Sequence, residues 1–317
     1  MGQILTHLRM LYDQSFPPKP TWGLDDIPDL TGKVIIVTGG NTGIGYETIK
    51  ALLPKNATVY MASRNRSKAE GAIRKLKEET GKEAMFLELD LADLKMVKKA
   101  AGEFKSRETQ LHVLFNSGGV FVPPIDQLTA DGYDLQFGTN VLGHFYFTKL
   151  LLPVLESTAK DSPEKHVRVV TTSSSVHMFW GPGIRYDSLV KGRVRERIGT
   201  NMLYGQSKYG NILVARELAR LYADKGIVST SVNPGNLRTE LQRHVTPLQD
   251  RIIGLVLFPA PMGALTQLYA GVAPEAKDLN GTYLIPWARV GDTRQDVKDP
   301  KAAEELWKWL EEQVKDI

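Results

Sequence analysis

The chain contains a tyrosine and a lysine four residues apart, in the segment Tyr204-Gly-Gln-Ser-Lys208. The segment opens a run of good helix formers, and on a helix this spacing places both side chains on one face. A free tyrosine has a pKa of about 10 and is a poor base at neutral pH. A nearby ammonium favours the phenolate and lowers that pKa, so such a pair could exchange a proton with a substrate oxygen. Helices often contain this spacing by chance. Its value as evidence for a catalytic pair therefore depends on where it lies among the predicted strands and helices.

A glycine-rich turn follows the first strand-like run, Val34–Thr38, and leads into a helical segment. It reads Thr38-Gly-Gly-Asn-Thr-Gly-Ile-Gly45. Gly39, Gly43 and Gly45 allow a tight turn and let the backbone approach a pyrophosphate at the helix amino terminus. A glycine cluster alone is weak evidence, but after the first strand of an alternating α/β chain it indicates a dinucleotide site rather than a bare structural turn.

The spacing of this turn is Gly-x-x-x-Gly-x-Gly, and with Thr38 it resembles the Thr-Gly-x-x-x-Gly-x-Gly motif of the short-chain dehydrogenase/reductase family. The resemblance covers nearly everything after residue 31 and implies an oxidoreductase that acts on CH–OH groups and binds a nicotinamide dinucleotide. The turn residues expected to contact the cofactor are Gly39, Asn41, Thr42, Gly43, Ile44 and Gly45.

The end of the second strand-like run bears on the choice between NAD and NADP, because in dinucleotide folds it faces the adenosine ribose. A carboxylate there binds the 2′-hydroxyl of NAD, whereas an arginine accommodates the 2′-phosphate of NADP. The chain reads Val59-Tyr-Met-Ala-Ser-Arg-Asn65 and has no acid at that point. Arg64 could also be a solvated surface residue, since Arg66 and Lys68 make the region basic. The missing carboxylate and the planar fork of Arg64 together favour NADP.

Two segments resemble the parts of the family that enclose the adenine and the middle of the dinucleotide. In Leu89-Asp-Leu91, Asp90 matches an aspartate that hydrogen-bonds the adenine edge, and Leu91 adjoins it. Asn116-Ser-Gly-Gly119 stands where the family has Asn-Asn-Ala-Gly. Asn116 and Gly118 are therefore expected at the cofactor, with the exact packing changed by the departure from the family pattern.

The nicotinamide end is matched by Asn233-Pro-Gly-Asn-Leu-Arg-Thr239. This segment is similar to the Pro-Gly turn of the family, and it predicts cofactor contacts from Pro234, Gly235 and Thr239. The resemblance also assigns Lys208 to the nicotinamide ribose and Tyr204 to the acid/base role beside the positively charged nicotinamide.

Two further positions complete the catalytic set that the resemblance implies. Val169-Val-Thr-Thr-Ser-Ser-Ser175 is a strand that ends in hydroxyls, and alignment on the family's serine pair makes Ser174 the residue that binds the substrate oxygen. Because Ser173 and Ser175 are of the same type, this assignment could shift by one, and two of the three could simply cap the strand. Asn140, inside a helical segment, matches the asparagine that holds a water of the proton relay.

Thirty positions separate Ser174 from Tyr204, and the longer segment between them resembles the retinol-dehydrogenase-like and WW-domain-oxidoreductase-like branch of the family. That likeness includes His177, which could contact substrate or simply pack. No WW domain is present. Residues 177–180 and the apolar stretch Ile252–Leu265 are expected to wall a hydrophobic substrate pocket, the latter as a mobile lid interrupted by prolines. Both could equally be core or dimer contacts.

The elements that must position these residues alternate between strands and helices, which predicts a doubly wound Rossmann fold of the α/β class. We expect a mostly parallel seven-stranded sheet with helices on both faces. After an N-terminal extension of residues 1–30, residues 31–317 form one NAD(P)-binding domain. The predicted strands are Val34–Thr38, Thr58–Ala62, Ala84–Leu89, Val113–Phe115, Val167–Thr172, Val228–Val232 and Thr282–Ile285, and the predicted helices include Ser67–Thr80, Asp93–Phe104, Asp131–Leu155 and Ser207–Asp224.

Composition excludes several classes of function. The 317 residues include no cysteine, which rules out disulfides, thiolate catalysis and cysteine zinc sites, and no metal is expected. The net charge of +4 arises from 40 basic and 36 acidic residues that form no block, so a nucleic-acid partner is not expected. A non-catalytic NADP-binding sensor or scaffold, or an epimerase or dehydratase on the same fold, remains the alternative to an oxidoreductase.

The sequence favours a cytoplasmic location, because it has no secretory signal and no stretch able to span a bilayer as a helix. The first residues, Met-Gly-Gln-Ile-Leu-Thr, fit the pattern for myristoylation at Gly2. A single acyl chain would give a weak, reversible membrane contact, which is the alternative to a purely cytoplasmic protein. The expected partner is a small hydrophobic alcohol or carbonyl compound, and a homodimer is a further alternative.

Overall fold

The computed structural model describes residues 2–237 and 257–317, with side chains from His7 onward. Its centre is one eight-stranded sheet in the order β3-β2-β1-β4-β5-β6-β7-β8. The strands are β1 Val34–Thr38, β2 Thr58–Ser63, β3 Met85–Glu88, β4 Val113–Asn116, β5 Val167–Thr172, β6 Ile227–Val232, β7 Tyr283–Ile285 and β8 Arg289–Gly291. The order reverses between β1 and β4, as in a doubly wound Rossmann fold.

The seven predicted strands are all present and parallel, and β8 is an addition to them. It pairs antiparallel with β7, with Leu284 opposite Val290. The central strands are rich in apolar and β-branched residues because helices cover both of their faces, and every residue of β1, β5 and β6 is buried.

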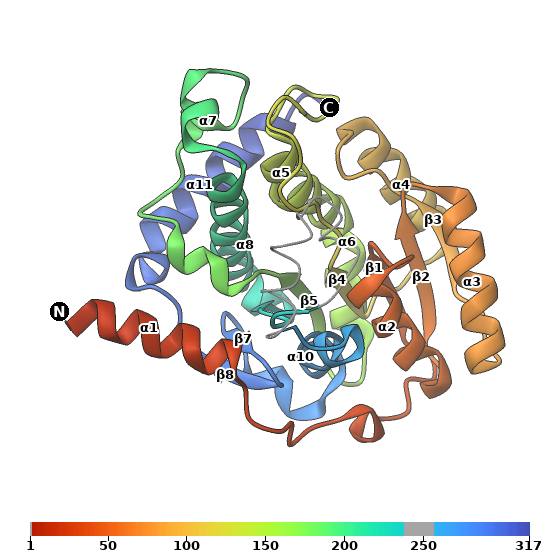
Figure 1. The fold of residues 1–317 in the computed structure, drawn as a ribbon. Coiled ribbons are helices and arrows are strands. Elements are labelled where there is room, and N and C mark those ends of the chain that lie inside the picture. The colour runs from red at the N-terminus through yellow and green to blue at the C-terminus, as the bar shows by residue number, and fades with distance from the viewer. Residues whose placement is uncertain (1, 238–256) are drawn as a thin grey trace.

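Helices cover both faces of this sheet (Figure 1). The described helices are α1 Gly2–Ser15, α2 Gly43–Leu52, α3 Arg66–Thr80, α4 Leu94–Arg107, α5 Leu135–Phe137, α6 His144–Asp161, α7 Arg193–Ile198, α8 Thr200–Tyr222, α10 Ala260–Val272 and α11 Pro300–Val314. Alternate residues of the strands serve two cores: Ile35 and Val37 pack with α2, α3 and α10, whereas Ile36 and Leu114 pack with α4, α6, α8 and α11. None of the helices in the described ranges is long and apolar enough to cross a membrane.

Local signals explain where several helices begin. The side chain of Asn65 accepts a hydrogen bond from the Lys68 amide at the start of α3, and Asp93 accepts from the Lys95 and Met96 amides at the start of α4. Both lie at the carboxyl ends of strands, so these caps turn the chain sharply back along the sheet.

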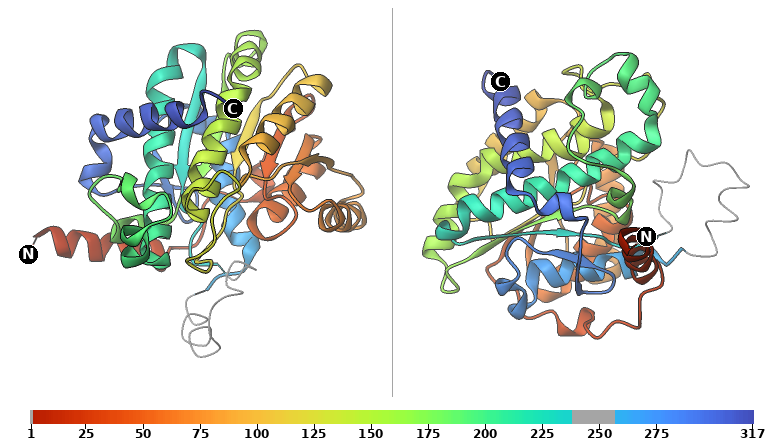
Figure 2. Two further views of the ribbon diagram at one scale, coloured as in Figure 1. Left: turned by 90° about the horizontal axis from the view of Figure 1, so that it is seen from above. Right: turned by 90° about the vertical axis from the view of Figure 1, so that its left-hand side faces the viewer.

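The predicted N-terminal extension begins with a regular helix, α1. α1 runs for 14 residues along the side of the molecule (Figure 2). Gln14 at its end is buried and accepts hydrogen bonds from Asn233 Nδ2 at 2.8 Å and Tyr283 Oη at 3.1 Å. Trp22, Ile27 and Leu30 then join the core beneath α2. Residues 14–30 are therefore tied to the sheet through both side-chain hydrogen bonds and apolar packing.

Candidate active site

The predicted reacting groups lie at the carboxyl-terminal edge of the parallel sheet. β5 ends at Thr172, one residue before the three serines, and α8 begins four residues before Tyr204. The first turns of α8 pack on the 3-10 turn Ser175–Phe179, where a Cβ placed on Gly205 would lie 3.4 Å from the carbonyl oxygen of Val176. This packing brings the segment after Ser174 against the turn of α8 that holds Tyr204.

Tyr204 and Lys208 lie on one face of α8, as the spacing predicts. Lys208 Nζ is 5.5 Å from the centre of the Tyr204 ring and donates a hydrogen bond to the carbonyl oxygen of Thr172 at 3.0 Å. That carbonyl also accepts from Asn211 Nδ2 at 2.9 Å, one turn further along α8. The end of β5 therefore holds the ammonium in place beneath the phenol.

Burial changes the acidity of both groups in the direction of their neutral forms. It raises the pKa of Tyr204 well above its usual value and lowers the pKa of Lys208 to about 8. For Tyr204 this is opposite to the lowering expected from a neighbouring ammonium. In the protein alone, Tyr204 is therefore an acid that holds its proton at neutral pH.

The three serines after β5 are distinguished by their surroundings. Ser173 is buried and donates its hydroxyl hydrogen to the carbonyl oxygen of Lys208 at 2.7 Å. That hydrogen is therefore already used within the protein. Ser175 is also buried, whereas Ser174 is partly exposed and only weakly capped to Val176 N at 3.4 Å. Ser174 is therefore the only one of the three serines that is not buried.

Asn140 lies in a π-helical turn, Gly138–Gly143, instead of a regular helix. Such turns are rare and are found frequently at functional sites. Its side chain receives a hydrogen bond from Val120 N at 2.9 Å and donates to Val120 O at 3.1 Å and to Ser207 Oγ at 3.0 Å. Both amide hydrogens are thus used by the protein, and the Asn140 side chain holds the loop after β4 at Val120.

The glycine-rich turn has the geometry that a pyrophosphate requires. Gly39 and Gly43 have φ of +66° and +55°, and a Cβ on Gly39 would lie only 2.7 Å from the Cα of Gly118. Thr42 begins α2 but caps no amide with its side chain, unlike the residues that begin α3 and α4. The first amides of α2, including those of Gly43, Ile44 and Gly45, therefore remain available for a phosphate. Asn41 is partly exposed in the same turn.

Arg64 is exposed directly after β2, and no hydrogen bond or ion pair holds it within residues 2–237 and 257–317. Its neighbour Arg66 is already engaged, with its guanidinium 4.6 Å from the centre of the Phe86 ring and 4.0 Å from Glu88. Of these two arginines at the end of β2, Arg64 is the one free to meet an incoming anion.

The other predicted cofactor residues are distributed along the same edge. Asp90 is partly buried and accepts from Ala92 N at 2.9 Å, and Leu91 packs 3.1 Å from the Cβ position of Gly118. Asn116 is buried and donates to Thr148 Oγ1 at 3.0 Å, while its Oδ1 has no hydrogen-bond partner among the described residues.

The Pro-Gly turn after β6 is closed on one side by aromatic packing. Pro234 is buried, and a Cβ on Gly235, whose φ is +89°, would contact the Trp287 ring at 3.1 Å. Thr239 and residues 252–256 of the predicted lid lie outside the described residues.

For the predicted substrate walls, the described residues favour packing, which was one of the two alternatives. His177 is fully buried against Tyr283, with ring centres 5.1 Å apart, and donates Nδ1–H to the carbonyl oxygen of Ser174. Met178 and Trp180 are also buried, so only Phe179, at 62% exposure, is left to face outward. In the described end of the apolar stretch, prolines do not break a helix. They start α10, because proline lacks an amide hydrogen that the first helical turn does not use.

A second polar cluster, missed from the sequence, joins the turn to the catalytic segment. Thr38 Oγ1 accepts the amides of Ser117 and Gly118, both at 2.9 Å. His144 lies between Thr38 and the Asn140 carbonyl, 2.8 Å from the former and 3.1 Å from the latter. A carbonyl can only accept, so Nδ1 donates; burial lowers the pKa of His144 to about 4, which leaves Nε2 free to accept from the Thr38 hydroxyl.

Phe121 and Ser207 also belong to the site but were not predicted from the sequence. Phe121 packs edge-on against the Tyr204 ring, with ring centres 4.7 Å apart. Ser207 lies inside the Tyr-x-x-x-Lys segment and links Asn140 to the carbonyl oxygen of Tyr204. The position of Ser207 in the motif could have indicated its role, whereas nothing local marks Phe121.

Comparison with known proteins agrees with this arrangement. The family model for short chain dehydrogenases matches residues 33–185. A short-chain dehydrogenase/reductase of Armillaria gallica is 55% identical over 306 residues, which cover 96% of this chain and 98% of that protein. The chain belongs to the short-chain dehydrogenase/reductase family. As a member it is an oxidoreductase and binds a nicotinamide cofactor.

Other relatives extend this comparison. An uncharacterised oxidoreductase of Schizosaccharomyces pombe is 39% identical, covering 94% of this chain and 89% of its own length. A crystal structure of an uncharacterised protein from Mycobacterium paratuberculosis has a TM-score of 0.72 at 30% identity, covering 93% and 97% of the two chains. RhlG of Pseudomonas aeruginosa, solved in a complex with NADP, shares the fold with a TM-score of 0.64 at 23% identity, over 81% and 95%.

Proposed function

We propose that this short-chain dehydrogenase/reductase uses NADP to interconvert a hydrophobic alcohol and its aldehyde or ketone, with Tyr204 as the acid/base. The observation that carries the proposal is the Tyr204–Lys208 pair, in which the ammonium lies 5.5 Å from the ring centre and is anchored to the end of β5. A sensor or scaffold would have no need for a lysine buried beneath a tyrosine.

The proton chemistry follows from the protonation states. Tyr204 holds its proton at neutral pH, because burial raises its pKa, and can donate that proton to a carbonyl oxygen during reduction. In the reverse direction its phenolate removes the proton of the alcohol. Ser174 is the nearby hydroxyl that can hold the substrate oxygen toward Tyr204. The bound nicotinamide supplies the hydride for reduction or accepts it in oxidation.

The residues along the sheet edge fit an extended dinucleotide. The glycine turn and the uncapped start of α2 suit the pyrophosphate, and Asp90 with Leu91 suits the adenine. Arg64 is unengaged and exposed where the 2′-phosphate of NADP is recognised in dinucleotide folds. The preference for NADP rests on Arg64 and on the missing acid beside it.

The hydrophobic character of the substrate rests on fewer residues than the sequence suggested, because His177, Met178 and Trp180 are buried. Phe121 beside the Tyr204 ring and the exposed Phe179 remain as apolar surfaces near the reacting groups. Both favour a substrate with an apolar group attached to the carbonyl carbon.

The direct test is turnover of NADPH by the purified protein with a panel of aldehydes and ketones, followed by the absorbance of the reduced nicotinamide. We expect oxidation of NADPH with at least one apolar aldehyde, at a rate well above the rate without substrate. Binding of NADPH with no turnover across the panel, and none of NADP with the matching alcohols, would instead support a non-catalytic binding protein.

A further inference from the structure

The loop between β4 and α5, residues 117–134, places an aromatic ring directly on the proposed catalytic tyrosine. Phe121 is partly exposed, and its ring meets the Tyr204 ring at an interplanar angle of 88° with centres 4.7 Å apart. This is the edge-to-face arrangement that aromatic pairs prefer. A ring held in this position lies beside the phenol that the proposed function assigns to the substrate oxygen.

The backbone on both sides of Phe121 is held by buried amide side chains. Before it, Val120 is fixed at its amide and its carbonyl by the side chain of Asn140. After it, the Val122 amide donates to Gln136 Oε1 at 2.9 Å. Val122 has a φ of +46°, a conformation that β-branched residues avoid and that persists only where surrounding contacts over-determine it. The loop is therefore forced into the shape that presents Phe121.

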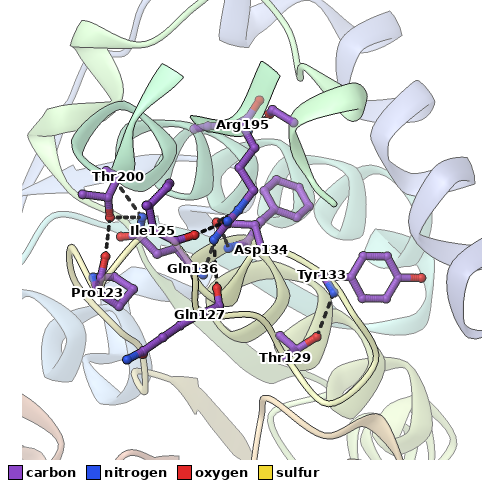
Figure 3. A network of polar contacts seen from close by, with 12 residues as sticks. Pro123, Ile125, Gln127, Thr129, Tyr133, Asp134, Gln136, Arg195 and Thr200 are labelled. Carbon is purple, nitrogen blue, oxygen red and sulfur yellow. Dashed lines mark hydrogen bonds and ion pairs between the residues drawn. The ribbon is translucent and has the colours of Figure 1, made fainter. Parts of the chain in front are cut away.

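A buried ion pair secures the rest of this loop from the segment that precedes Tyr204 (Figure 3). Arg195 Nε is 2.9 Å from Asp134 Oδ2, and both side chains are almost fully buried. Arg195 also donates to the carbonyl oxygens of Ile125 and Gln127, and Thr200 Oγ1 donates to Pro123 O at 2.8 Å. The long segment between Ser174 and Tyr204 thus clamps the loop on which Phe121 stands.

We propose that Phe121 is a specificity-determining residue, held against Tyr204 by this clamp, and that it selects substrates with an aromatic group next to the carbonyl. An edge-to-face or stacked ring pair contributes roughly twofold to tenfold in binding beyond the burial of area. An aliphatic chain gains the burial alone. The inference deepens the proposed function and rests on it, because it names the class of carbonyl compound that the site takes.

The test compares kcat/KM for benzaldehyde and for hexanal, with NADPH, in the wild type and in Phe121→Leu. Leucine keeps an apolar side chain and removes the ring, so the ratio of the two values should shift toward hexanal by at least about threefold. Phe16→Leu is the matched control, since Phe16 is an exposed aromatic residue of the N-terminal extension. Its ratio should equal that of the wild type.

A second pair of variants tests the clamp without touching Phe121. Thr200→Val removes the hydroxyl that holds Pro123, and Thr200→Ser keeps it. We expect the valine variant to move the ratio in the same direction as Phe121→Leu, by about twofold, and the serine variant to restore it. NADPH affinity, measured by fluorescence titration, should stay unchanged in all of these variants.

The outcomes separate the two proposals. A wild type that binds NADPH but reduces neither aldehyde, nor any of the wider panel, overturns the proposed function and this inference with it. An active wild type whose Phe121→Leu variant loses activity on both aldehydes equally, or keeps the original ratio, overturns only the inference and makes Phe121 a structural support for Tyr204. If Phe121→Leu shifts the ratio of the two kcat/KM values and Thr200→Val does not, the contact between Thr200 and Pro123 has no part in substrate selection.

Discussion

At the scale of single residues, the site depends on groups whose neighbours fix their charge and direction. Lys208 is anchored by Thr172, and Ser173 by Lys208, while Ser174 and Arg64 are left with free functional groups. Chemically similar neighbours thus have different surroundings: one serine of three and one arginine of two are available to ligands. This contrast gives each prediction at this scale a matched control.

Arg64→Ala should weaken NADPH binding by roughly tenfold to a hundredfold and leave NADH binding nearly unchanged, because only NADPH has the 2′-phosphate and a charge-assisted contact is lost. Arg66→Ala is the control and should affect both cofactors little, since Arg66 is engaged with Phe86 and Glu88. Fluorescence titration with each cofactor measures the effect. Equal losses of NADPH and NADH in Arg64→Ala would show that the arginine has no part in cofactor choice.

The pH dependence should differ between the two directions of the reaction. Carbonyl reduction needs the protonated phenol, and burial raises the pKa of Tyr204, so reduction should persist from neutral into alkaline pH. Alcohol oxidation needs the phenolate, so its kcat/KM should rise with pH from about pH 6 to pH 10. Above pH 8, deprotonation of Lys208 removes the charge that favours the phenolate and should flatten this rise. An oxidation rate independent of pH would argue against Tyr204 as the base.

At the scale of elements, the site is assembled from segments that hold one another at their ends. The short helix α5 starts at Asp134, whose carboxylate accepts the amides of Gln136 and Phe137 and also pairs with Arg195 of α7. The π-helical turn follows at once and offers Asn140 to the loop after β4. One buried carboxylate therefore joins a helix start, a neighbouring helix and the loop beside Tyr204.

Arg195→Met should destabilise the protein by about 3–5 kcal/mol, because it leaves the Asp134 carboxylate buried without its partner. Arg197→Met on the same helix is the control and should change stability little, since Arg197 is exposed. Equilibrium unfolding in urea measures the difference. A loss below about 1 kcal/mol in Arg195→Met would mean that the pair is not the anchor of this region.

The sequence was informative where an element is long and locally determined. β1 and β5 run over the predicted residues, because short segments rich in β-branched residues form covered parallel strands. The three-residue β8 gave no such pattern, and its pairing with β7 depends on the hairpin between them. The predicted helix over 131–155 is split by the π-helical turn, which depends on contacts that Asn140 makes with residues distant in the sequence.

The same division holds within the site. Tyr204, Lys208, Ser174 and the glycine turn could be predicted, because their spacing along the chain is the signal. Phe121 and the Asp134–Arg195 pair could not, since they come together only through tertiary packing, 83 and 61 positions apart. The burial of His177 was missed because a lone histidine near a predicted site gives no information on the direction of its side chain.

At the scale of the whole molecule, the N-terminal extension is connected to the cofactor edge of the sheet. Gln14 at the end of α1 accepts from Asn233, which precedes the Pro-Gly turn after β6, and from Tyr283 of β7. Asp13 pairs with Arg289 of β8 at 2.9 Å. The end of α1 thus meets β6, β7 and β8 at one side of the sheet, and these strands are supported by residues that lie far from them in the sequence.

Gln14→Ala should lower the free energy of unfolding by about 2–4 kcal/mol, because it leaves two buried donors, on Asn233 and Tyr283, without their acceptor. Gln110→Ala is the control, because Gln110 is exposed. Urea unfolding of the full chain gives both values. Equal stability of the two variants would show that the extension adds little to the fold.

The proposed reaction depends most on Tyr204 as the proton donor, and Tyr204→Phe tests this role most directly. Hydride transfer in a single turnover should fall at least a hundredfold, because the variant has no transferable proton, whereas NADPH affinity measured by fluorescence titration should stay within about threefold of the wild type. A variant that binds NADPH normally and retains more than about a tenth of the wild-type rate would contradict the central claim and assign the proton to another group.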